Sequence, residues 1–294
     1  MNPEALSTLD DFQLLDVRLA DDFEAAHLDG AKNNCVFEVD FVNRLPDTAP
    51  DKTLTTVVYG ANADSQEAEA ALEKLTREGY TSVQILEGGI EAAESAGLSI
   101  VNGDPLPDAP AAADGVLGID LAESTVEWLG RNLINKHFGF AKLESGQLEF
   151  ADGVLTGGEF SIDLRQLECT DLKDSKLHDV LIHHLESDDF FDVANHPTAR
   201  FVITGSTPIA DACPGGPNLE IEGDLTLRGK TESIQFTATA GLTPEGTPAA
   251  QAAFAIDRTR WGVLYGSGKF FKRLAGHLVN DQIEFQLRII TEGS

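Results

Sequence analysis

The chain has 294 residues and carries 49 acidic against 21 basic side chains, which gives a formal net charge of -28. At roughly 100–200 residues per domain, this length predicts two domains, and a hydrophobic content of 42% is enough for buried cores. The surplus negative charge repels phosphate groups, so nucleic acid and anionic membrane surfaces are excluded as expected partners. A surface adapted to high salt explains the same charge equally well.

Three features concern the compartment. The segment from Met1 to Phe12 has neither the basic nor the apolar region of a secretory signal. Cys35, Cys169 and Cys213 lie far apart and offer no disulfide framework, which fits a reducing compartment. No run of about 18 uncharged apolar residues is present, so no membrane span is expected. We therefore expect a cytoplasmic protein.

A segment rich in proline and alanine, residues 104–114, has the composition of a linker. It predicts a first domain over residues 1–103 and a second over 115–294. In the first domain, strands are expected at Phe12–Arg18, Leu54–Gly60 and Ser82–Leu86, with a helix over Ser65–Glu78. This alternation of strands and helices predicts an α/β domain with a parallel sheet.

The segments LLDVRLADDFEAAHLDGAKN, VVYG and GYTSVQILEGGIEA resemble the rhodanese family in order and spacing. The family implies a sulfur-transferring cysteine at the start of the loop after the VVY strand, but this sequence has Gly60 there. Because glycine cannot act as a nucleophile, we expect no sulfurtransferase activity, no catalytic residue and a domain kept for interaction or regulation with a protein partner. Asp16, Arg18 and His27 are interpreted as scaffold.

The second domain consists mostly of short segments with alternating large apolar residues, such as GEFSIDL, SIQFTATA and QIEFQLRII. About eight such strands, separated by turn residues and interrupted by a helix near Lys176–Leu185, predict an antiparallel barrel or sandwich. The segments IDLAESTVEWLG, GGEFSIDL, HLESDDFFDVANHPTARFVITG, EGDLTLRGKTESIQF and FAIDRTRWG resemble the YceI-like family. That resemblance implies a lipocalin-like β-barrel that binds a long polyisoprenoid or a similar lipid.

Strand parity places one apolar, aromatic face inside the barrel, where it either lines a channel or packs a closed core. Arg258 follows Ile256 on this face, so its guanidinium is expected near the mouth, bound to a diphosphate or quinone head group or in a salt bridge. His137 is a second polar candidate of the same kind. The predicted ligand-binding residues are Val126, Trp128, His137, Phe150, Phe160, Phe201, Phe236, Phe254, Arg258 and Trp261.

The leading hypothesis is a non-enzymatic binder of a polyisoprenoid, isoprenoid quinone or similar lipid that requires no cofactor. No metal site is predicted, because His178 and His183 lack the i, i+4 spacing of a helical metal motif. Two alternatives stay open: an interaction or stress scaffold with a filled barrel, and a sulfur or redox protein that uses Cys35 or Cys169. The oligomeric state is also open, a dimer included.

Overall fold

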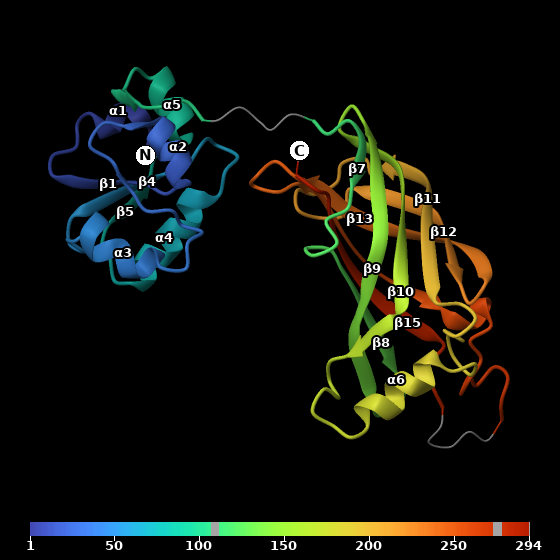
Figure 1. Cartoon of the computed structure of the whole chain (residues 1–294). Helices are drawn as coiled ribbons and strands as arrows, with labels where there is room; N and C mark the ends of the chain where they lie inside the picture. The colour runs from blue at the N-terminus through green and yellow to red at the C-terminus, as the bar shows by residue number, and fades with distance from the viewer. Residues whose placement is uncertain (107–111, 273–277, 294) are drawn as a thin grey trace. The chain divides into compact units, whose positions relative to one another are not determined.

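The computed structural model describes residues 1–106, 112–272 and 278–293. The chain divides into two compact units, Met1–Ala109 and Pro110–Ser294 (Figure 1). Of the predicted linker 104–114, residues 107–111 lie outside the described ranges. No helix among the described residues is both long and apolar enough to cross a membrane.

The first unit is built around a parallel sheet with the strand order β3-β1-β4-β5, and β2 and β6 form a separate antiparallel pair. Its elements are α1 (Pro3–Leu6), β1 (Phe12–Asp16), α2 (Ala20–Ala25), β2 (Ala26–Leu28), β3 (Lys32–Asn33), α3 (Phe41–Thr48), β4 (Thr55–Tyr59), α4 (Glu67–Arg77), β5 (Val83–Ile85), α5 (Gly89–Ser95) and β6 (Ile100–Asn102). The predicted α/β domain is confirmed.

Both faces of this sheet are covered because neighbouring residues of its central strands point to opposite sides. Leu15 and Val58 pack with α3 and α4, whereas Leu14 and Val57 pack with α1 and α5. The helix predicted at Ser65–Glu78 forms as α4 and ends before Gly79, whose φ of +89° is the left-handed conformation of a helix C-terminus.

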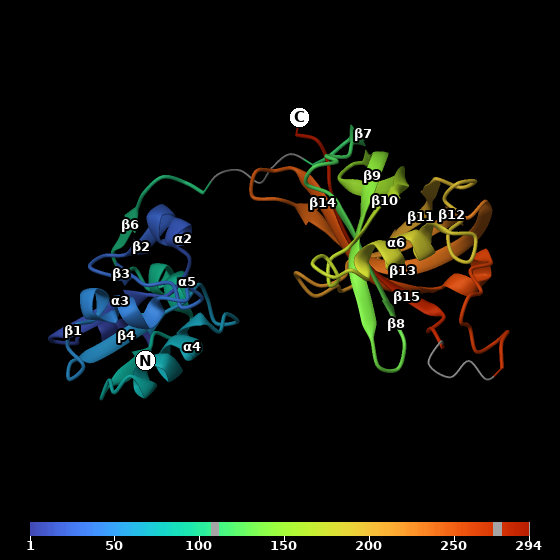
Figure 2. The ribbon, with the colours of Figure 1, turned by 60° about the horizontal axis from the view of Figure 1, so that its bottom comes forward.

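The second unit is a closed antiparallel barrel of eight strands, β8 to β15, in which β9 and β10 pair to close the ring and β7 extends β9. Its elements are β7 (Gly115–Gly118), β8 (Thr125–Arg131), β9 (Lys136–Ala151), β10 (Val154–Cys169), α6 (His178–Glu186), β11 (Thr198–Pro208), β12 (Leu219–Leu227), β13 (Lys230–Leu242), β14 (Pro248–Asp257), a 3-10 turn η1 (Arg258–Trp261) and β15 (Gln282–Ile290). The eight predicted strands and the helical insertion are confirmed, although β9 is longer than the predicted segment. Figures 1 and 2 show α6 across one end of the barrel.

Candidate functional site

The barrel contains an apolar cavity of about 120 Å³ in the half nearer to α6. Large aliphatic side chains, among them Leu148 and Ile221, are buried in the other half, and a second cavity of about 550 Å³, lined among others by Phe150, Leu155 and Leu219, opens at that end. The cavity nearer to α6 is the smaller of the two but is almost purely apolar, whereas the second has a more polar lining. Of the described residues that line the cavity nearer to α6, only Arg258, Asn280 and Trp128 have polar side chains.

Aromatic rings from β10, β11, β13, β14 and β15 form a continuous row along the cavity wall. The row runs through Phe160, Phe201, Phe236, Phe254 and Phe285, with centroid separations of 5.4, 5.7, 4.1 and 5.7 Å. The pair of Phe236 and Phe254 is stacked, with an angle of 9° between the rings. Trp128 lies beside Phe285 in the β8–β15 register and extends the row. Such a surface presents ring faces and edges to a slim apolar chain.

The predicted site residues divide into two groups. The following line the cavity: Val126, Trp128, Phe160, Phe201, Phe236, Phe254 and Arg258. Phe150, Trp261 and His137 do not. Phe150 has the expected inward parity but lies in the other half of the barrel, with Leu155 and Leu219. Trp261 is buried in the wall, where its Nε1 donates to Leu225 O at 2.9 Å. His137 lies outside the cavity, paired with Asp171.

Arg258 is 1% exposed, and protein oxygens surround its guanidinium. Its Nε donates to Asn280 O at 3.0 Å, its Nη1 to Val263 O at 2.8 Å, and its Nη2 to Tyr265 O at 2.8 Å. The carboxylate of Asp281 lies 3.6 Å from Nη2. Burial lowers the pKa of Arg258, and the nearby carboxylates oppose this shift. Of the two predicted roles, the salt bridge matches the contact with Asp281. The donors that a head group would need are held by backbone carbonyls of the loops that close the barrel.

Two groups of lining residues were missed by the sequence analysis. Phe285 alternates with Ile283 and Leu287 along β15, so strand parity alone was sufficient to place it inside. Leu185, Phe190 and Phe191 come from α6 and the turn that follows it. No periodicity within the helix indicates that this segment crosses the open end of a barrel, because that placement depends on the closure of β10 onto β11.

In the first unit, the side-chain ends of Ser65 and Glu67 occupy the space beside Gly60 that a side chain there would take. A Cβ atom there would lie 2.5 Å from Glu67 Oε2 and 2.8 Å from Ser65 Oγ. Glu67 Oε2 is buried and accepts no hydrogen bond from the described residues. The loop is also tied to α5, since Ile90 N donates to Gly60 O at 3.1 Å. A carboxylate thus occupies the position from which a residue-60 thiolate would project.

Asp16 and Arg18 form a buried bidentate pair at the end of β1, with Nε–Oδ1 and Nη2–Oδ2 distances of 3.0 and 2.6 Å. The guanidinium also donates to Ala26 O at 2.7 Å and thereby fixes the start of β2. His27 stacks on Phe23 with a centroid distance of 3.8 Å, and its Nδ1 lies 2.7 Å from Phe23 O. These contacts give all three residues structural roles.

His184 of α6 packs against aromatic rings and lies near an acidic side chain. His184 packs edge-on against Phe190 and Tyr265, and its Nε2 lies 3.8 Å from Asp189. Within the described ranges, none of the histidines of this segment belongs to a group of three ligands that could share a metal ion.

Comparison with known proteins follows the division into two units. The rhodanese-like domain model matches residues 2–96, and the YceI-like domain model matches residues 118–290. A protein described as UPF0312 from Shewanella denitrificans is 31% identical over 137 residues, covering 45% of this chain and 65% of its own length. A UPF0312 protein from Pseudomonas savastanoi is 37% identical over 89 residues, or 28% of this chain and 44% of its own length. The chain therefore spans less than two thirds of these relatives.

Solved structures resemble each unit. BcnA of Burkholderia cenocepacia is 23% identical, with a TM-score of 0.48, over 59% of this chain and 99% of its own. A polyisoprenoid binding domain from Saccharophagus degradans is 12% identical, with a TM-score of 0.45, over 62% and 100%. The rhodanese-like domain of an Anabaena protein is 26% identical, with a TM-score of 0.32, over 39% and 86%. The YceI-like family model covers residues 118–290, so the chain belongs to the YceI-like family. It also carries a rhodanese-like domain, which precedes the barrel in the sequence.

Proposed function

We propose that the barrel binds a slim, uncharged isoprenoid, such as a polyprenol or an isoprenoid quinone, in the cavity beneath α6. The observation that carries this proposal is the row of aromatic rings around a space with almost no polar lining. Burial of apolar surface is worth about 25 cal/mol per Å², so each 100 Å² of ligand buried there contributes about 2.5 kcal/mol. Such a site needs no catalytic group.

The charges favour an uncharged head group over a diphosphate. Arg258 is the only basic residue among those described as lining the cavity, and its donors point to backbone carbonyls. A diphosphate would be desolvated without a free cation as partner, which is costly. Trp128 Nε1 is buried and makes no hydrogen bond to any described residue. A carbonyl or hydroxyl oxygen on the ligand would satisfy this donor.

The volume of the cavity limits how much of the ligand it can hold. A cavity of about 120 Å³ is somewhat smaller than an engineered apolar cavity of about 150 Å³ that binds benzene. It therefore accommodates a narrow segment of chain, and a longer isoprenoid requires the facing aromatic side chains to move apart.

We propose that the rhodanese-like unit is not an enzyme and serves as an interaction or regulatory module for a protein partner. Gly60 supplies no thiol, and Glu67 brings negative charge to the place where an anionic intermediate would form. An assay with thiosulfate and cyanide checks this directly. Turnover above the uncatalysed background would contradict the proposal.

The ligand is tested in two steps. First, the purified chain is extracted with organic solvent and the extract is examined by mass spectrometry for isoprenoids. Second, the stripped protein is titrated with farnesol, ubiquinone and farnesyl diphosphate. We expect the two uncharged compounds to bind, and farnesyl diphosphate to bind at least tenfold more weakly because its diphosphate would be desolvated. A tenfold difference in affinity corresponds to about 1.4 kcal/mol.

Ala199→Phe places a ring in the cavity, where Ala199 is buried. Ala255→Phe is its matched control, because Ala255 is exposed on the barrel wall between two inward residues. Loss of binding in Ala199→Phe and its retention in Ala255→Phe would support the cavity as the site. Equal binding in both variants, or preferential binding of farnesyl diphosphate, would overturn the proposal.

A further inference from the structure

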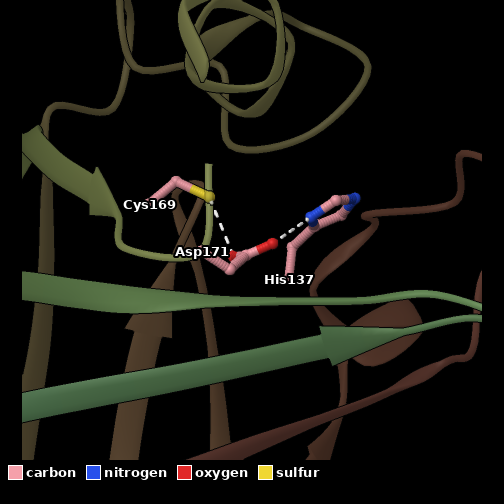
Figure 3. A group of neighbouring side chains, drawn as sticks. All are labelled: His137, Cys169 and Asp171. Atoms are coloured by element: carbon pink, nitrogen blue, oxygen red, sulfur yellow. Dashed lines mark hydrogen bonds and ion pairs between the residues drawn. The ribbon is translucent and has the colours of Figure 1, made fainter. Parts of the chain in front are cut away.

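His137, Cys169 and Asp171 form a compact cluster outside the cavity, at the start of β9 and the end of β10 (Figure 3). The Asp171 carboxylate lies between the other two side chains. His137 Nδ1 is 2.9 Å from Asp171 Oδ2, and Cys169 Sγ donates to Asp171 Oδ1 at 3.2 Å. The three ligand atoms all lie within 4.8 Å of one another. They bring one nitrogen, one sulfur and one oxygen atom to a single point.

Strand pairing holds the cluster rigidly. Cys169 pairs with Gly139 across β10 and β9, and Thr170 N donates to Phe138 O at 2.8 Å. Phe138 N donates to Asp171 Oδ1 at 2.9 Å, which orients the carboxylate. Gly139 permits this close approach, because a Cβ atom there would lie 1.7 Å from Glu168 O. The cluster is thus preorganised by the backbone before any ligand arrives.

The cluster is closed on the sulfur side and open on the other. Cys169 is 1% exposed, whereas the side chains of His137 and Asp171 are 39% and 19% exposed. An incoming cation therefore reaches His137 and Asp171 first, from the open side.

We propose that His137, Cys169 and Asp171 bind a divalent transition-metal ion of the Zn²⁺ type, with water in the fourth position. Thiolate, imidazole and carboxylate are the ligands that Zn²⁺ takes in proteins, and three protein ligands with one open position are a known arrangement. Tetrahedral coordination requires the ligand atoms to move apart slightly from their hydrogen-bonding distances. The half-exposed His137 has the freedom to do this.

Binding exchanges one proton for the metal and involves no change of oxidation state. Cys169 Sγ donates a hydrogen bond to Asp171 Oδ1, so the thiol carries its proton without metal. The metal displaces this proton, which passes to water, and the thiolate becomes a ligand. The ion would then join the start of β9 to the end of β10, one strand away from Trp128 of the cavity, which pairs with Gly139.

The test uses Co²⁺ as a spectroscopic probe on the full chain, with Zn²⁺ in competition. One equivalent of Co²⁺ should produce a thiolate-to-cobalt charge-transfer band and the visible bands of a four-coordinate site, and one equivalent of Zn²⁺ should remove them. Zn²⁺ should also raise the midpoint of thermal unfolding relative to protein in chelator. Cys169→Ser should lose the charge-transfer band, and Cys169→Ser and Asp171→Asn should each weaken Zn²⁺ binding by about 100-fold or more, since even outer-shell changes cost 10–100-fold.

Cys213→Ser is the matched control, because Cys213 is a free, exposed cysteine in the same unit. It should keep the band and the affinity. Circular dichroism of Cys169→Ser in chelator checks that the variant is folded. Absence of the band at one equivalent, its survival in Cys169→Ser, or its loss in Cys213→Ser would overturn the proposal. These readouts are independent of isoprenoid binding, so either proposal can fail alone.

Discussion

The ring of Phe201 lies directly over Gly223 of the neighbouring strand, so closely that a Cβ atom on Gly223 would come within 2.2 Å of Phe201 Cζ. The missing side chain on β12 lets the ring reach across that strand to Phe236 on β13, 5.7 Å away between centroids. The aromatic row of the cavity is therefore continuous because one glycine interrupts the inward side chains of β12.

Gly223→Ala should push the Phe201 ring out of this position. Overpacking a well-packed core lowers the free energy of unfolding by about 1–3 kcal/mol. Displacement of the ring should also weaken isoprenoid binding. Both tryptophans, Trp128 and Trp261, lie in the barrel unit, so tryptophan fluorescence during urea unfolding follows that unit alone. Gly241→Ala is the control, since a Cβ there meets nothing within 4 Å. Equal stability of the two variants would contradict the role of Gly223.

Arg258→Met should destabilise the barrel strongly. The substitution leaves Val263 O, Tyr265 O and Asn280 O without the donor that now joins them, and breaking buried charged contacts costs about 3–5 kcal/mol. Arg260→Met removes a neighbouring guanidinium that is 42% exposed and pairs with Glu232, so its cost should stay within about 1 kcal/mol. Fluorescence-detected unfolding of both variants checks this. Similar losses would show that Arg258 does not hold the closing loops.

Asp163→Asn should reveal a pH-dependent contribution to barrel stability. Hydrogen bonds from Arg165 and Gln166 lower the pKa of Asp163 from 3.8 to about 2. A lowered folded-state pKa stabilises the fold above the ordinary value, and this contribution is lost as the pH falls toward 2. Because Arg165 is 57% exposed, screening reduces the effect to about 1 kcal/mol.

The measurement is urea unfolding of wild type and Asp163→Asn at a series of pH values. Their difference in unfolding free energy should be constant between about pH 5 and pH 7 and should shrink below about pH 4. A difference that persists unchanged at the lowest pH at which the barrel still folds would show that the carboxylate charge is not its origin.

Gly60→Cys alone should not form a persulfide with thiosulfate. The new Cβ would lie 2.5 Å from Glu67 Oε2, and the carboxylate charge opposes a thiolate beside it. Gly60→Cys/Glu67→Ala removes both obstacles and should take up one sulfur atom, seen as added mass in the intact protein. If the single variant reacts as readily as the double variant, Glu67 does not occupy the anion position of the loop.

The sequence by itself determined the two units and the faces of their strands. Alternation in segments such as GEFSIDL and QIEFQLRII predicted an antiparallel barrel or sandwich, because in a sheet with one buried face the pattern of period two decides which side chains point inward. The resemblance to the YceI-like family then selected the barrel. Alternation alone was enough to place Val126, Phe160, Phe201, Phe236 and Phe254 on the inner wall.

Tertiary structure decided where along the barrel each inward residue lies and what surrounds it. Phe150 shares the inward parity of Phe160, yet it lies in the other half, because parity defines a face and not a height along the axis. Arg258 points inward as predicted, but loops distant in sequence supply the carbonyls that surround it. His137 and Asp171 are 34 residues apart and meet only because β9 and β10 pair. Contacts of this kind depend on chain closure, and no local pattern of residues encodes them.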